Sequence, residues 1–133
     1  MNISTKNPAR TLPELLHAAV GCGYAWYNSY RGYESFEKAL VSFGRYSRGF
    51  SKDKKKEALL RGKELYAMAE DEMRNLFHKN IKCTGKDWEE ILDSTEEFRN
   101  LLSAMKARFP GFADISYRHA VRLAVFYSGF GGK

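Results

Sequence analysis

The chain has 133 residues, the length of one domain, and its hydrophobic share of 44% and charged share of 29% are typical of a soluble globular protein. No apolar run is long enough to span a bilayer, so we expect no membrane association and a cytoplasmic protein. Two cysteines, Cys22 and Cys83, lie far apart and define no disulfide framework.

The first predicted helix begins with Thr11-Leu12-Pro13-Glu14, which matches a capping box with Thr11 as the N-cap and Glu14 three residues later. Apolar residues recur at helical spacing from Leu12 to Tyr30. Gly21 and Gly23 interrupt this stripe. We expect another helix to approach closely at both glycines.

Four more helices are predicted from apolar periodicity and capping residues. Their expected ranges are about 34–46, Ser51 to about His78 with Ser51 as the cap, Thr84 to Phe109-Pro110-Gly111, and Asp114 to about Tyr127 with Asp114 as the cap. The last of these is apolar nearly all round, which is typical of a central helix. The sequence thus predicts an all-α fold, a compact bundle of about five helices. It forms one domain over residues 1–133, with flexible ends at 1–10 and 129–133.

Motifs for catalysis or metal binding are missing from the sequence. His17, His78 and His119 have no ligand-type residues at metal-site spacing, and HExxH does not occur. The segment GKDWEE at Gly85 lacks the upstream glycine and the following Ser or Thr of a phosphate-binding loop. We therefore predict a protein that is not an enzyme and that needs no cofactor or metal.

The strongest functional signal is the segment 43–63, FGRYSRGFSKDKKKEALLRGK, called the basic stretch below. It holds eight Lys or Arg against Asp53 and Glu57, and this excess equals the net charge of the whole chain, +6. A lysine cluster in the first turns of a helix is disfavoured by the helix dipole and by like-charge repulsion, so its presence there indicates a function. Phosphates attract such side chains.

The basic stretch predicts a sequence-nonspecific nucleic-acid interface, with RNA and DNA both open. The expected phosphate-binding residues are Arg45, Arg48, Lys52, Lys54, Lys55, Lys56, Arg61 and Lys63, and the Tyr46 ring is expected to stack on a base. Arg118 and Arg122 extend the interface if the last helix exposes them, and otherwise form salt bridges at its rim. The alternative that these lysines only form a solvated helix start, with no binding role, also remains open.

An acidic cluster on the fourth predicted helix suggests a rival function. Its members are Asp87, Glu89, Glu90, Asp93, Glu96 and Glu97. A solvated face explains them, since negative charge is favoured in the N-terminal half of a helix. The alternative is a partner-binding or inhibitory protein, such as a phage- or plasmid-type regulator, that uses this acidic face or the Trp/Tyr-rich surface of the first helix.

Two segments of the chain carry a resemblance to a known family. The segments RTLPELLHAAVGCGYAWYNSYRG and HAVRLAVFYSGFGGK resemble parts of the small all-helical subunits of CRISPR effector complexes, which serve antiviral defence. The resemblance implies a non-catalytic subunit of a larger ribonucleoprotein that holds a nucleic-acid strand through Lys and Arg. It also implies contacts with other protein subunits, including copies of the same chain. The middle of the chain has no counterpart in that family.

Overall fold

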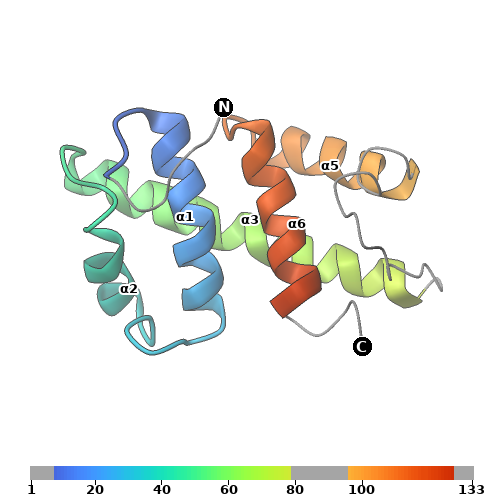
Figure 1. The fold of residues 1–133 in the computed structure, drawn as a ribbon, viewed down its shortest axis with the longest axis horizontal. Helices are drawn as coiled ribbons and strands as arrows, with labels where there is room; N and C mark the ends of the chain where they lie inside the picture. The colour runs from blue at the N-terminus through green and yellow to red at the C-terminus, as the bar shows by residue number, and fades with distance from the viewer. Residues whose placement is uncertain (1–7, 79–95, 128–133) are drawn as a thin grey trace.

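The longest helix, α3 (Lys52–His78), is the element on which the others pack. The computed structural model describes residues 8–78 and 96–127. These ranges also contain α1 (Leu12–Tyr27), α2 (Phe36–Phe43), α5 (Glu96–Arg108) and α6 (Asp114–Tyr127). Helices α1 and α6 lie side by side across α3, with α2 beside the N-terminal part of α3 and α5 beside its C-terminal part (Figure 1). All regular structure in these ranges is helical, which confirms the predicted all-α class.

The core is built from one buried face of each helix. Its largest fully buried side chains include Phe43 of α2, Tyr66 of α3, Phe98 of α5 and Tyr117 of α6. Helix α6 buries residues on most of its circumference, as its apolar composition predicts, although Ile115 is 40% exposed. Burial of these side chains supplies the main free energy of folding.

Two of the three predicted helix caps are confirmed. The Glu14 N–H donates to Thr11 Oγ1 at 3.4 Å and the Thr11 N–H donates to Glu14 Oε1 at 3.0 Å, which completes the capping box. At the start of α3, the Lys54 N–H donates to Ser51 Oγ at 3.2 Å. Asp114 is not a cap but the first residue of α6, and its carboxylate pairs with Lys106 of α5 at 2.7 Å.

The first two helices are shorter than the sequence predicts. Helix α1 stops at Tyr27 because Asn28 caps it and Ser29 turns into the left-handed region with φ of 53°. Helix α2 begins after its own cap, Ser35, and Gly44 ends it. Ala9, inside a stretch expected to be flexible, is buried, and its N–H donates to the Tyr46 carbonyl at 2.7 Å.

Helices α1 and α3 meet at two glycines. A Cβ on Gly23 would lie 2.3 Å from the Lys63 nitrogen, and one on Gly62 would lie 2.2 Å from the Ala19 carbonyl oxygen. The predicted close approach is therefore confirmed at Gly23. It is wrong at Gly21, where the nearest atom to a Cβ would be His119 Nε2 at 3.9 Å.

Several predictions fall on residues outside the described ranges. These are the start of the fourth helix at Thr84, the acidic residues 87–93, Cys83 and the tail 129–133. Within the ranges that the structure covers, none of the helices is both long and apolar enough to cross a membrane.

Candidate nucleic-acid interface

The loop between α2 and α3 carries the first cations of the basic stretch. Ser47 is buried and its hydroxyl donates to the Phe43 carbonyl at 3.0 Å, which holds the loop against the end of α2. Gly49 has a φ of 88°, a conformation that suits glycine. Arg45 and Arg48 are exposed on either side of the buried serine. The loop thus presents two guanidinium groups to solvent from a fixed backbone.

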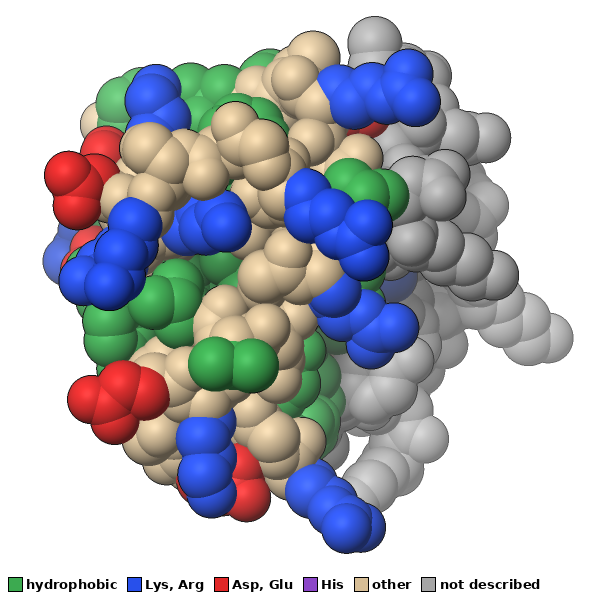
Figure 2. All heavy atoms as spheres, turned by 90° about the vertical axis from the view of Figure 1, so that its left-hand side faces the viewer, with side chains coloured by type: hydrophobic (Ala, Val, Ile, Leu, Met, Phe, Trp, Pro, Cys, Tyr) green, Lys and Arg blue, Asp and Glu red, His purple; other side chains and the backbone are tan. Residues whose placement is uncertain are grey.

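The first turns of α3 add four lysines beside these arginines. Lys52 and Lys54 are exposed, whereas Lys55 and Lys56 are half-buried. We call the surface formed by these lysines and by the two loop arginines the basic face. Figure 2 looks onto the end of the molecule that carries α2 and the start of α3, and Lys and Arg side chains spread widely over it while Asp and Glu are fewer. The excess of cations over carboxylates on this surface raises the local concentration of polyanions.

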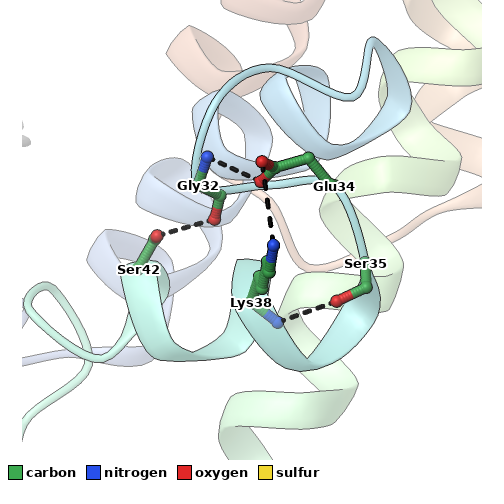
Figure 3. A network of polar contacts seen from close by, with 5 residues as sticks. All are labelled: Gly32, Glu34, Ser35, Lys38 and Ser42. Carbon is green, nitrogen blue, oxygen red and sulfur yellow. Dashed lines mark hydrogen bonds and ion pairs between the residues drawn. The ribbon is translucent and has the colours of Figure 1, made fainter.

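A small polar network fixes the loop that precedes α2 at the same end of the molecule (Figure 3). The Ser42 hydroxyl donates to the Gly32 carbonyl at 3.0 Å, and the Gly32 N–H donates to Glu34 Oε1 at 2.7 Å. Backbone N–H groups, its own and that of Gly32, hold the pKa of Glu34 below its ordinary value. Glu34 also pairs with Lys38 at 3.8 Å, but both side chains are so exposed that this pair opens at little cost.

Two predicted phosphate-binding residues make contacts inside the protein instead. The Arg61 guanidinium lies 5.1 Å from the centre of the Phe112 ring and donates to the Pro110 carbonyl, which ties α3 to the α5–α6 loop. Lys63 places its Nζ 3.8 Å from the centre of the Trp26 ring. Both residues are half-buried, and these contacts within the protein already engage their charged groups.

The aromatic residues of the basic stretch are also engaged. Tyr46 is half-buried against the core, with the Arg45 guanidinium 5.5 Å from its ring centre. Phe50 packs on the core as well. The ring predicted to stack on a base therefore already has partners on the protein.

Arg118 and Arg122 do not join the basic face. Both lie half-buried on α6, and α1 separates α6 from α2 (Figure 1). The hydrogen bond from Lys106 first, and the charges of Lys106 and Arg118 after it, lower the pKa of Asp114. Arg118 thus contributes to the electrostatics at the start of α6.

A stacked pair of a buried and a half-buried histidine was not predicted from the sequence. His17 of α1 and His119 of α6 stack with ring centres 5.0 Å apart, and His17 Nδ1 lies 2.8 Å from Ser116 Oγ. Burial lowers the pKa of His17, and burial together with the neighbouring histidine lowers that of His119 to about 4. Both rings are therefore neutral at physiological pH. Within the described ranges, no group of three His, Cys, Asp or Glu is placed to hold a metal ion.

Cys22 shows the properties expected of a structural thiol. It is buried and lies 3.7 Å from the Tyr33 hydroxyl. Burial raises the pKa of the Cys22 thiol to about 11, so it stays protonated and weakly nucleophilic at neutral pH.

Comparisons of the chain with protein-family models, with curated proteins and with solved structures found no match. The function must therefore be argued from the side chains of the chain itself.

Proposed function

We propose that the protein is a non-catalytic nucleic-acid-binding subunit of a larger ribonucleoprotein assembly, and that it holds nucleic acid through the basic face. The observation that supports this proposal is the exposure of Arg45, Arg48, Lys52 and Lys54 on one loop and the adjoining helix start. The lysines stand where the dipole of α3 disfavours positive charge, so their placement lowers the stability of the free protein and is repaid when phosphates bind.

Recognition on this face is sequence-nonspecific. Lys and Arg that contact phosphates position a nucleic acid but read no base edges. Of the predicted phosphate-binding residues, the basic face contains Arg45, Arg48, Lys52, Lys54, Lys55 and Lys56. Contacts with other subunits, including further copies of the chain, belong to the same proposal.

Replacement of Lys54, Lys55 and Lys56 by Gln tests the proposal. We expect the dissociation constant for labelled DNA and RNA to rise about tenfold or more for every sequence, and the slope of log K against log salt to shrink by about two to three. Fluorescence anisotropy across a salt series measures both quantities.

The matched control removes the same charge from the other end of the molecule. Arg99, Lys106 and Arg108 lie exposed on α5, far from α2 (Figure 1), and their replacement by Gln is expected to change affinity much less. Equal losses in the two triple variants would show that only net charge matters and would count against the basic face.

A second candidate function has one observation in its favour. Tyr27 and Tyr30 are 37% and 45% exposed at the end of α1, where a protein partner has an aromatic surface to contact. If this candidate is correct, replacing both tyrosines by Ser abolishes capture of the partner, while the Lys54/Lys55/Lys56 variant captures it normally. The reverse pattern in a pull-down would eliminate the candidate.

A further inference from the structure

Rings that stack on bases are the usual means of holding a single strand, and those that belong to the basic stretch or contact it already pack against other parts of the protein. The Trp26 ring has Lys63 over it at 3.8 Å and the Phe36 ring at 5.1 Å. Tyr46 and Phe50 pack on the core. A base that stacked on any of these rings would have to displace a contact that the protein already makes.

The exposed aromatic rings lie at the end of α1, and one of them has carboxylates beside it. Tyr27 and Tyr30, at 37% and 45%, are the most exposed aromatic side chains among those whose burial the structure describes. They belong to a tyrosine cluster with Tyr24 and Tyr66, in which ring centres lie 5.0–5.3 Å apart and Tyr30 and Tyr24 join through their hydroxyl groups.

Carboxylates stand beside this tyrosine cluster. Burial first, and then the charges of Glu70 and Asp71, raise the pKa of Tyr27. Both carboxylates pair with Arg74, at 3.2 Å and 4.0 Å, so one guanidinium faces two negative charges. A strand laid over Tyr27 would bring its phosphates towards net negative charge.

The hollow beside the basic face is small and is lined by no aromatic ring. It is lined by Leu12, Leu16 and Ala58 with the charged Lys54, Glu57 and Arg61, and its volume is about 50 Å³. That volume holds a few water molecules. The cations themselves are spread over a wide part of the face that Figure 2 shows.

From this separation of cations and exposed rings we infer that the ligand of the basic face is a nucleic-acid duplex, contacted through its phosphates. The inference rests on the proposed function and names its substrate class. A duplex keeps its bases stacked inside and offers two rows of phosphates, so it needs no ring from the protein. A single strand offers fewer phosphates per unit length and gains no stacking here.

Competition between duplex and single strands tests the inference. The full chain is titrated with a labelled DNA duplex, a labelled RNA duplex and the corresponding single strands, at equal phosphate concentration and several salt concentrations. We expect both duplexes to bind about tenfold more tightly than either single strand, with the steeper salt dependence. A preference for one duplex type would show whether the ligand is DNA or RNA.

Two variants sharpen the result. The Lys54/Lys55/Lys56 to Gln variant is expected to weaken duplex binding, and Tyr30→Ala is expected to leave it within about twofold of the wild type. Single strands that bind as tightly as duplexes, or that lose affinity in Tyr30→Ala, would overturn the inference while leaving nucleic-acid binding intact. No binding to any of the four probes at low salt would overturn the proposed function and the inference with it.

Discussion

Replacement of Gly62 by Ala is expected to destabilise the protein by about 3 kcal/mol, at the upper end of the usual cost of overpacking. The added Cβ would lie 2.2 Å from the Ala19 carbonyl oxygen and 2.4 Å from its carbon. Both atoms belong to the backbone of α1, so no side-chain rotation relieves the overlap. The two helices must therefore move apart along their shared interface.

Chemical denaturation followed by far-UV circular dichroism measures this loss. A loss of about 3 kcal/mol corresponds to a fall of about 10 °C in the melting temperature of a domain of this size. The same substitution at Gly21 is the control, because a Cβ there has no atom nearer than 3.9 Å. Gly21→Ala is expected to stabilise the protein by about 0.5–1 kcal/mol, since Ala is the better helix former. Equal effects of the two substitutions would contradict the close crossing at Gly62.

The parts of the fold that were predicted from the sequence depend on local signals. The starts of α1 and α3 are marked by Thr11 and Ser51, whose side chains reach N–H groups only three residues away. The apolar residues of α3 likewise recur at helical spacing, a pattern that can be recognised within the helix itself. By contrast, the end of α1 depends on the backbone of Ser29, a residue with no strong preference for that conformation.

The candidate site was predicted only in part, for a related reason. Sequence identifies a lysine, but whether the lysine faces solvent or another helix depends on the tertiary fold. Lys63 and Lys56 are on one side of α3 by helical spacing, yet Lys63 meets Trp26 of α1. Arg61 meets a loop 49 residues away in the chain. The exposed cations that remain are Arg45 and Arg48 of the loop and Lys52 and Lys54 at the start of α3.

Gly62 and the histidine pair were not predicted, because only a contact between two helices reveals their role. A glycine inside α3 has no local mark of a helix crossing until Ala19 of α1 is placed against it. His17 and His119 are about a hundred residues apart in the chain, and neither has a neighbour in sequence that indicates the other. Residues whose role depends on a contact between distant parts of the chain can be identified only when the fold is known.

The histidine pair is expected to make the protein sensitive to mild acid. In the unfolded chain both histidines take up protons with an ordinary pKa of about 6.5. In the folded protein the pKa of His119 is about 4, because its ring is half-buried and lies beside His17. The unfolded state therefore binds more protons between these values. The stability that neutral histidines provide is complete above pH 6.5 and is lost as the pH falls towards 4.

We expect the free energy of unfolding to fall by on the order of 2 kcal/mol between pH 7 and pH 4.5. Glu14, Glu34 and Asp114 have lowered pKa values and remain charged over most of this window, so they contribute little to the change within it. Urea denaturation at a series of pH values gives the curve for the wild type and for His119→Gln, which carries no titrating group at that position.

The difference between the two curves separates protonation from packing. At pH 7 both histidines are neutral, so the stability difference there measures only the altered contacts of residue 119 with His17 and α1. Below pH 6.5 the wild type loses the stability of its neutral pair, whereas His119→Gln loses only the smaller share that belongs to His17, whose pKa is also lowered by burial. The curves should therefore converge as the pH falls. Parallel curves from pH 7 to pH 4.5 would mean that His119 is protonated as easily in the folded protein as in the unfolded chain.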